Sequence, residues 1–304
     1  MLAPPPRKPA RKKAAAKRSR NPQRAERVRR PAPGSLVDGQ YKCPTGALAY
    51  KLYTPTGSAR RRLPLLVMLH GCTQTAADFA AGTEMNRLAD ELGFLVLYPE
   101  QSISANMMRC WNWFRPENQR RGSGEAATIA GMTRETIARC KANPARVYIA
   151  DISAGGSAAA IIAAAYPELY VAVGVHSAVA KGNTTGARAA FAATRGVAAG
   201  VDTARSRRPA PTILFQGDRD RAVHPSSAEG FVRSLTLSNP RLALDRTVHV
   251  PPGNARPYTR TIYAKGKAKP LLEAWMVHGA GHAWSGGSGR APSTIPPDPI
   301  LRAR

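Results

Sequence analysis

The chain has 304 residues, 43% of them hydrophobic, and a formal net charge of +26 at pH 7. This length and apolar content are sufficient for one sizeable hydrophobic core. No stretch approaches 18 consecutive apolar residues, which excludes a membrane-spanning helix. No apolar segment follows the first charged residues, so we find no secretory signal and expect a cytoplasmic protein.

The positive charge is concentrated at the N-terminus. Residues 1–34 contain 12 Lys/Arg against a single acidic residue, Glu26, so they carry +11 of the net charge. They are rich in Pro and Ala and nearly free of large apolar side chains. We therefore predict a basic disordered tail over 1–34 and a single domain over 35–304. The favoured interpretation is a merely solvated extension; the alternative is non-specific contact with a polyanion by charge alone.

Beyond the tail, short apolar runs alternate with longer segments of helical spacing. Strands are predicted at 65–69, 94–98, 147–150, 171–175, 212–215 and 271–277. Helices are predicted at 78–92, at 125–142, in the Ala-rich segment that ends at 165, and after a capping box formed by Ser226 and Glu229. This alternation predicts an α/β fold in which helices cover both faces of a mostly parallel central sheet.

Two segments do not follow the alternation. Residues 178–210 are rich in Ala, Gly and Arg and contain no predicted strand, so they are a candidate cap over a site. Residues 288–304 are rich in Pro and Arg and lack a helical period, so we predict an irregular C-terminal tail.

Ser153 stands at the most informative position of the chain. The β-branched apolar run 147–150 leads to it, and three small residues, 154–156, follow. This pattern predicts a strand, a sharp turn and a helix, which is the nucleophile elbow that presents a serine hydroxyl at the top of a parallel sheet. The usual form is G-x-S-x-G, but Asp151 occupies the first glycine position. A larger, charged side chain there is expected to crowd the turn.

A serine nucleophile needs a base, and the base needs an orienting carboxylate. In folds that carry a nucleophile elbow on a parallel sheet, the catalytic residues occur along the chain in the order Ser, then Asp or Glu, then His. The loop after the strand at 212–215 contains Asp220, the preferred acid, and Asp218, the alternative, which otherwise caps the turn.

The base is predicted to be His282, in a Gly-rich loop after the last strand. His278, at the strand end, is expected to pack or bond locally. The His-x-x-x-His spacing would suggest a metal only on a helix, and the glycines at 279 and 281 argue against one. The four cysteines show no CxxC spacing, which argues against structural zinc and permits disulfides without requiring them.

Ester cleavage through a tetrahedral oxyanion requires two preorganised N–H donors. We predict the backbone N–H groups of Ala154, directly after the nucleophile, and of Cys72, in the turn after the strand at 65–69. The thiol of Cys72 is then incidental. Several ring-bearing residues are predicted to line the substrate cleft, with core or loop packing as the alternative: Trp111, Trp113, Phe114, His176 and Trp284.

Together these segments resemble the polyhydroxybutyrate (PHB) depolymerase family of esterases in the α/β-hydrolase superfamily. The resemblance covers roughly residues 50–287 and rests on Leu69-His-Gly-Cys-Thr-Gln, Cys110-Trp-Asn-Trp-Phe, Arg120-Arg-Gly-Ser-Gly-Glu, Ile152-Ser-Ala-Gly-Gly, Val173-Gly-Val-His-Ser, Gly217-Asp-Arg-Asp-Arg-Ala-Val-His-Pro and His278-Gly-Ala-Gly-His-Ala-Trp-Ser-Gly-Gly. It implies Ser153, Asp220 and His282 as the triad, with Cys72 and Ala154 at the oxyanion hole.

The resemblance implies hydrolysis of short-chain hydroxyalkanoate polyesters or oligomers through an acyl-enzyme, with no cofactor and no metal. Feruloyl and acetylxylan esterases are relatives and form the first alternative. The second is an impaired hydrolase fold that binds a polyester or a polyanion, because Asp151 and the atypical C-terminus depart from the family pattern. Many family members are secreted, so an extracellular location is the alternative to the cytoplasm.

Overall fold

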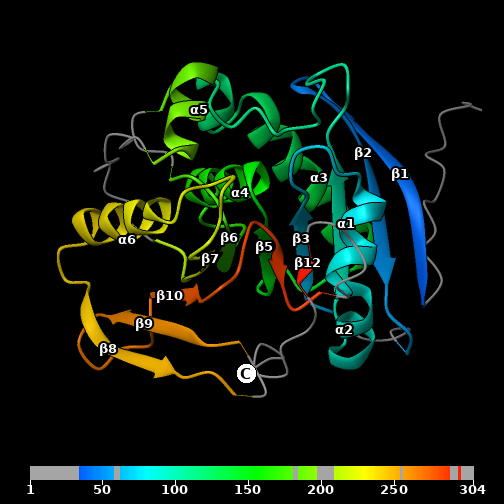
Figure 1. Ribbon diagram of the computed structural model, residues 1–304. Coiled ribbons are helices and arrows are strands. Elements are labelled where there is room, and N and C mark those ends of the chain that lie inside the picture. The colour runs from blue at the N-terminus through cyan, green and yellow to red at the C-terminus, as the bar shows by residue number, and fades with distance from the viewer. Residues whose placement is uncertain are drawn as a thin grey trace, which may run out of the picture.

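The computed structural model describes residues 34–57, 62–180, 184–196, 209–253, 256–287 and 294–295 (Figure 1). The strands in these ranges are β1 Ser35–Cys43, β2 Gly46–Thr54, β3 Leu65–Leu69, β4 Leu95–Glu100, β5 Val147–Asp151, β6 Ala172–His176, β7 Thr212–Gly217, β8 Ala243–Val250, β9 Tyr258–Ala264, β10 Leu272–Val277, β11 Trp284–Ser285 and β12 Thr294–Ile295. The helices are α1 Ala76–Thr83, α2 Met85–Leu92, the 3₁₀ helix η1 Pro116–Gln119, α3 Gly124–Cys140, α4 Ala154–Ala165, α5 Ala187–Thr194 and α6 Ser226–Ser238.

The described strands form one large sheet in the order β1-β2-β4-β3-β5-β6-β7-β10-β9-β8 and a small pair, β11-β12. The central strands from β4 to β10 run parallel to one another. Antiparallel strands flank them, β2 and β1 on one side and β9 and β8 on the other. The prediction of a mostly parallel α/β sheet is confirmed. Parallel order matters for the site because all central strands end at the same edge.

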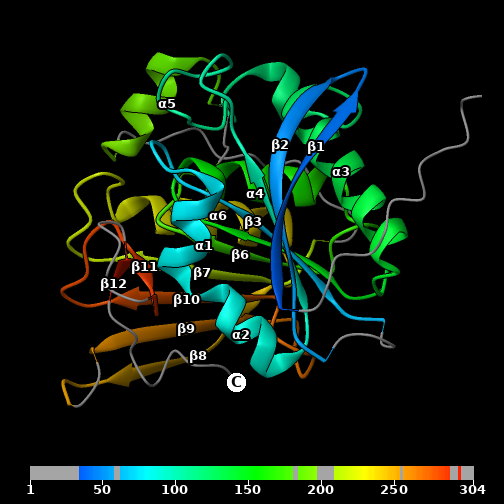
Figure 2. The same cartoon turned by 90° about the vertical axis from the view of Figure 1, so that its right-hand side faces the viewer.

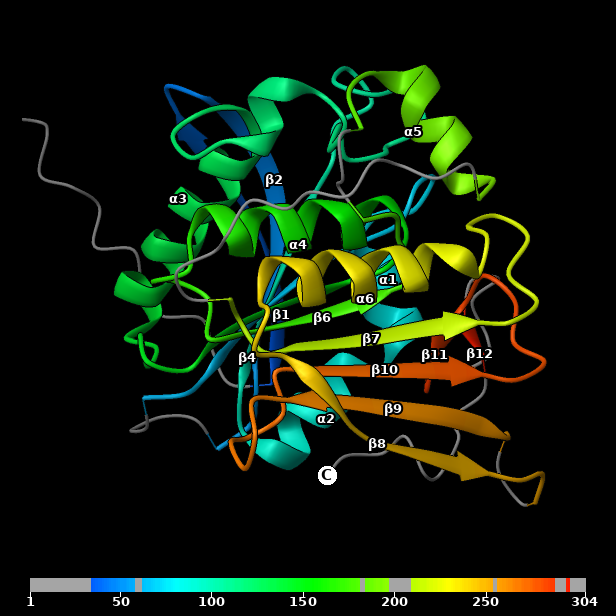
Figure 3. The same cartoon turned by 90° about the vertical axis from the view of Figure 1, so that its left-hand side faces the viewer.

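Helices cover both faces of this sheet, as a parallel sheet requires. Strand β3 shows the alternation: Leu65, Val67 and Leu69 pack with α3 and α4, whereas Met68 packs with α1. Figure 2 shows α1 and α2 in front of the sheet, and Figure 3, from the opposite side, shows α4 and α6 in front of it. The sheet therefore holds two separate apolar layers, one on each face.

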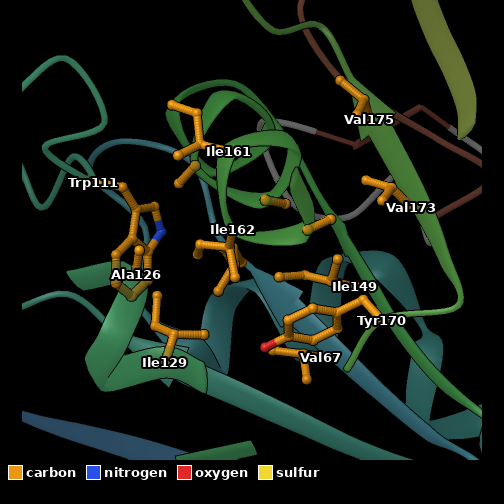
Figure 4. Close-up of a cluster of buried hydrophobic side chains, with 14 of the residues drawn as sticks. Val67, Trp111, Ala126, Ile129, Ile149, Ile161, Ile162, Tyr170, Val173 and Val175 are labelled. Atoms are coloured by element: carbon orange, nitrogen blue, oxygen red, sulfur yellow. The ribbon is translucent and has the colours of Figure 1, made fainter. Parts of the chain in front are cut away.

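The larger layer anchors α4, the helix that begins at the elbow. Ile161 and Ile162 of α4 are 4% and 1% exposed, and Ile149 of β5 and Val67 of β3 are fully buried in the same cluster (Figure 4). Burying each such side chain contributes about 1.5–3 kcal/mol relative to leaving it in water. The N-terminus of α4 is thereby held against the ends of the central strands.

Two sequence predictions of helices need correction. The single helix at 78–92 is two helices, because Glu84 adopts a left-handed conformation with φ 52° between α1 and α2. The capping box at Ser226 is also absent: α6 begins after Pro225 with no side-chain cap. Ser226 Oγ instead pairs with His224 Nδ1 at 2.9 Å.

Several elements were not predicted from the sequence: β1, β2, β8, β9 and α5. In the candidate cap segment 178–210, the structure places α5, while 181–183 and 197–208 lie outside the described residues. The predicted basic tail lies outside them except for Gly34, and so does the predicted irregular tail 288–304 except for β12. Among the described helices, none has the length and apolar character needed to cross a bilayer.

Candidate active site

Ser153 occupies a sharp turn between β5 and α4, as the elbow pattern predicts. Its φ of 61° and ψ of −124° lie outside the regions that a serine ordinarily adopts. A backbone hydrogen bond from Ser153 N to His176 O, 2.9 Å, ties the turn to the end of β6. Strained backbone of this kind persists only when its surroundings hold it, and it is the hallmark of a nucleophile elbow.

Glycine is required at the second residue after Ser153. A Cβ built on Gly155 would lie 2.5 Å from Leu69 O and 2.7 Å from His70 O, both main-chain atoms. The first turn of α4 therefore approaches the end of β3 too closely for any side chain. This contact brings the N-terminus of α4 and the loop after β3 to the same place.

Asp151 is accommodated beside a glycine and does not clash with the turn. Its side chain is fully buried, and its Oδ1 lies 2.5 Å from the position of a Cβ on Gly156. Oδ1 accepts a long hydrogen bond from His176 N, 3.4 Å, and Oδ2 has no partner among the described residues. Burial therefore raises the pKa of Asp151 well above its ordinary value, with only the His176 N–H opposing it. Burial thus favours the neutral form of this carboxyl over the charged form.

Asp220 and His282 are brought together. Asp220 Oδ2 lies 2.8 Å from His282 Nδ1, while Oδ1 accepts from Ala222 N at 2.9 Å and from Val223 N at 2.8 Å. Burial alone would raise the pKa of Asp220, but the hydrogen bond and charge of His282 and the Val223 N–H outweigh it and lower that pKa. Asp220 is therefore an ionised acceptor that fixes the orientation of the imidazole.

This orientation leaves His282 Nε2 free to act as a base. Because Nδ1 donates to Asp220, the neutral ring carries its lone pair on Nε2. The side chain of His282 is 23% exposed, so the ring is partly accessible. Within the described residues no hydrogen bond joins His282 to Ser153.

The alternative acid, Asp218, has a histidine of its own. Asp218 Oδ2 lies 2.9 Å from His278 Nδ1, and its Oδ1 accepts from Gly279 N at 2.7 Å. The partner of His278 is thus not local in the sequence, because Asp218 lies 60 residues away in the loop after β7. The two aspartates of one loop pair separately with the two histidines of the other.

The turn after β3 contacts the elbow directly. A Cβ on Gly71 would lie 3.3 Å from Ile152 Cγ2 and 3.5 Å from Ser153 Cβ. The next residue is Cys72, whose backbone N–H is the predicted second oxyanion donor. The other predicted donor, Ala154 N, belongs to the first turn of α4, where backbone N–H groups lack partners within the helix. Gly71, the residue before Cys72, therefore lies beside Ser153, and Ala154 directly follows the serine in the chain.

The thiol of Cys72 is not incidental, contrary to the sequence interpretation. Cys72 forms a disulfide with Cys110, and Thr73 N donates to Met108 O at 2.6 Å. Thr73 itself has a φ of 64°. The oxyanion turn is consequently fastened to the loop at 106–110 by one covalent bond and one hydrogen bond.

The side chains predicted to line the substrate cleft are more buried than the lining of an open cleft would be. Trp111 is fully buried and donates from Nε1 to His70 O at 3.1 Å, and Trp113 is 5% exposed. Both match the packing alternative, as does Phe114, half-buried edge-to-face on Trp113. Trp284 is half-buried and packs edge-to-face on Phe79, with ring centres 5.6 Å apart.

His176 supports the loop that carries His282. It is 3% exposed, and its Nε2 accepts from Ser285 N at 3.1 Å, while its Nδ1 lies 2.9 Å from Ser177 Oγ. Its ring stacks on Trp284 at 5.5 Å. Burial, reinforced by the nearby charge of His282, lowers the pKa of His176 to about 3, so the ring is neutral.

Two residues that hold neighbouring groups by hydrogen bonds were not singled out in the sequence, and only the first contacts the proposed triad. Gln216 Nε2 donates to Asp220 Oδ2 at 3.2 Å, and Glu125 accepts from Gln101 Nε2 and from Asn112 N at 2.6 and 2.9 Å. Gln216 lies in the strand just before the acid loop, and Glu125 is a lone acid at a helix start. Neither position is distinctive without knowledge of its partners. Among the described side chains no cluster of three or more His, Cys, Asp or Glu is placed to hold a metal ion.

Comparisons with known proteins identify the family of the chain. Residues 48–241 match the family model described as Esterase PHB depolymerase. The chain is 32% identical over 248 residues to poly(3-hydroxyalkanoate) depolymerase C of Paucimonas lemoignei, covering 78% of this chain and 58% of that protein. It is 30% identical over 236 residues to feruloyl esterase B of Neurospora crassa, covering 72% of this chain and 77% of that one.

A solved structure shows the same fold. The acetyl xylan esterase from Aspergillus awamori superimposes with a TM-score of 0.70 at 22% identity, covering 82% of this chain and 94% of that one. The chain spans little more than half the length of the Paucimonas depolymerase it matches. By fold and by family model, this chain is a member of the PHB depolymerase family of esterases within the α/β-hydrolase superfamily.

Proposed function

We propose that the protein hydrolyses carboxylic esters through an acyl-enzyme on Ser153. The observation that carries the proposal is the 2.8 Å hydrogen bond between Asp220 Oδ2 and His282 Nδ1, formed at the same sheet edge as the strained Ser153 turn. In this mechanism His282 Nε2 takes the proton of Ser153 Oγ as the oxygen attacks the ester carbonyl. The same proton then passes to the leaving alcohol.

The developing negative charge needs donors, and we propose two backbone N–H groups for this role. Ala154 N and Cys72 N would hold the oxyanion, while Asp220 stabilises the imidazolium that forms on His282. Water then attacks the acyl-enzyme with His282 again as the base. All groups in this cycle come from the chain itself, so no cofactor is part of the proposal.

The test is Ser153→Ala with p-nitrophenyl butyrate as substrate. We expect turnover to fall by at least about 10⁴-fold, because the nucleophile is lost. A fluorophosphonate probe should label the wild-type chain and leave the variant unlabelled. Retained turnover in the variant, with the fold intact by circular dichroism, would exclude this mechanism.

For the substrate we propose short-chain hydroxyalkanoate polyesters or their oligomers, since the chain resembles poly(3-hydroxyalkanoate) depolymerase C. The second candidate is a feruloyl or acetylxylan ester, supported by the greater share of the feruloyl esterase that the chain covers and by the fold match to an acetyl xylan esterase. Specificity constants for hydroxybutyrate oligomers, methyl ferulate and acetylated xylan, measured side by side, separate the two. The oligomers are expected to give the highest value.

An impaired hydrolase that only binds a polyester or a polyanion is the third candidate. It rests on Asp151 and on the atypical C-terminus, and the space for Asp151 beside Gly156, together with the raised pKa of its carboxyl, weakens the first of these grounds. Probe labelling decides the matter, since a dead site would not react. The predicted polyanion contact of residues 1–34 is tested separately: retention on heparin that is unchanged after their deletion would refute it.

The Cys72–Cys110 disulfide supports an oxidising compartment over the predicted cytoplasm, because reducing compartments keep such thiols free. We expect reduction by dithiothreitol to lower turnover by about tenfold, since the oxyanion turn loses its covalent anchor. The Cys43→Ser variant, which lacks one of the cysteines outside the disulfide, is the matched control and should respond as the wild type does. Turnover indifferent to complete reduction would argue against the anchor.

A further inference from the structure

A chain of four hydrogen-bonded side chains lies behind the His282 loop and outside the proposed triad. Asp218 Oδ2 bonds His278 Nδ1 at 2.9 Å, His278 Nε2 bonds Thr259 Oγ1 at 2.9 Å, and Thr259 Oγ1 bonds His249 Nδ1 at 3.0 Å. These hydrogen bonds run from the loop after β7, past the end of β10, to β9 and β8. No step of the ester hydrolysis uses it.

A single assignment of hydrogen atoms gives each of these three hydrogen bonds one donor and one acceptor. Asp218 is an acceptor, so His278 Nδ1 carries the hydrogen and Nε2 accepts from the hydroxyl of Thr259. The hydroxyl oxygen then accepts from His249 Nδ1–H. Each group thus holds the next in a fixed direction, and the ring of His278 is bound on both of its nitrogens.

Asp218 also holds the main chain of the base loop. Its Oδ1 accepts from Gly279 N at 2.7 Å, and Gly279 adopts a left-handed φ of 74° at the start of this loop. One carboxylate therefore fixes a side chain and a backbone N–H of consecutive residues. His282 follows only three positions later along the loop.

The loop after β7, which carries Asp218 and Asp220, touches the loop after β10, which carries His278 and His282. Arg219 N donates to Ala280 O at 2.9 Å, and a Cβ on Gly217 would come within 2.3 Å of the same oxygen. Asp218 lies two residues before Asp220 in one loop, and Gly279 lies three residues before His282 in the other. The hydrogen bonds of Asp218 to His278 and Gly279 therefore set the distance between the two loops, and with it the distance between Asp220 and His282.

We propose that Asp218 and His278 form a positioning pair that sets the approach of His282 to Asp220. The inference rests on the proposed function, since the geometry matters only if His282 is the base. The side chains of Asp218 and His278 are 36% and 39% exposed, and exposed pairs of this kind contribute little to global stability. Loss of the pair should thus impair the chemistry while leaving the fold in place.

The test compares Asp218→Ala, His278→Ala and two polar replacements of His278. Both alanine variants are expected to lower kcat for p-nitrophenyl butyrate about tenfold with KM within about twofold, because displacement of the base raises the barrier without changing ground-state binding. His278→Asn keeps an N–H near the place of Nδ1 and should recover most of the loss. His278→Gln, whose amide reaches the place of Nε2 instead, should not.

The matched control is Asp38→Asn, which removes a carboxylate paired with Lys51 at the opposite edge of the sheet. It should keep wild-type kcat. Melting temperatures of all variants should agree within about 3 °C, because only surface pairs are lost. A loss of activity that follows the melting temperature, a change confined to KM, or equal activities for His278→Asn and His278→Gln would overturn the proposal.

A measurement without substrate separates this proposal from the proposed function. The Nδ1 proton of His282, hydrogen-bonded to Asp220, is expected as a downfield resonance in proton NMR. It should broaden or shift in Asp218→Ala and remain unchanged in Asp38→Asn. An unchanged resonance in Asp218→Ala refutes the positioning pair whether or not Ser153 reacts, whereas absence of probe labelling in the wild type refutes the proposed function alone.

Discussion

Two buried aspartates lie at the ends of two central strands, and the pKa values of their carboxyl groups shift in opposite directions. Asp151 ends β5 and is fully buried; Asp220 follows β7 and is 4% exposed. The pKa of Asp151 is raised, whereas that of Asp220 is lowered. Burial by itself raises the pKa of both, so the difference comes from the donors that surround each carboxyl.

The donors differ in number and in distance. Asp220 accepts from two backbone N–H groups within 2.9 Å and bonds His282 at 2.8 Å, while Asp151 has one contact at 3.4 Å and a second oxygen with no described partner. The loop after β7 thus builds a site for a negative charge. The end of β5 only makes room for a neutral acid, beside Gly156.

The largest effect is expected when the charged carboxylate of Asp220 is removed. Asp220→Asn should lower kcat/KM for p-nitrophenyl butyrate by about 10³- to 10⁴-fold, because the amide favours the wrong tautomer of His282. Asp218→Asn serves as the control and should lose far less. Similar losses in the two variants would show that the structure pairs the wrong aspartate with the base.

An intermediate effect is expected where Asp151 meets α4. In Gly156→Ala the new Cβ would lie 2.5 Å from Asp151 Oδ1 and 2.4 Å from Ala178 Cβ, so we expect a loss of about 1–3 kcal/mol in the free energy of unfolding. Asp151→Gly in the same chain should return part of it. Denaturant unfolding of both single variants and the double variant measures the coupling, and strict additivity would contradict the contact.

The smallest effect on turnover is expected from a change at the Asp151 carboxyl itself. Asp151→Asn removes a group whose folded-state pKa lies above its ordinary 3.8, so the folded wild type retains a proton that the unfolded chain has lost. This contribution of Asp151 is full below pH 3.8 and is lost as the pH rises toward the folded pKa. The stability advantage of Asp151→Asn should therefore grow with pH above about 4, by at most about 1.4 kcal/mol per unit.

Urea unfolding of the wild type and Asp151→Asn at several pH values between 4 and 8 provides this measurement. Turnover of Asp151→Asn should stay within about threefold of the wild type, because the amide has nearly the shape of the neutral carboxyl that burial favours. A stability difference that is constant across this pH range would mean that Asp151 is ionised in the folded protein.

The sequence predicted the parts of the site that depend on local pattern. Ser153, Asp220 and His282 each follow a predicted strand, and parallel strands deliver such residues to one edge of the sheet. The strand at β3 and the turn at Cys72 were found for the same reason. The broken helix at Glu84 and the uncapped start of α6 were not, because a single residue's φ and the partner of Ser226 are not encoded in periodicity.

Other features depend on residues distant in the chain. Cys72 and Cys110 are 38 positions apart, and Asp218 and His278 are 60 apart. Apolar periodicity reports which face of an element is buried, but it contains no information about which polar groups meet. The sequence alone therefore determined the alternation of the central strands and helices and the sheet edge at which the candidate site residues lie. Only the tertiary structure decided which aspartate holds a charge, because that depends on donors that separate segments bring to each carboxyl.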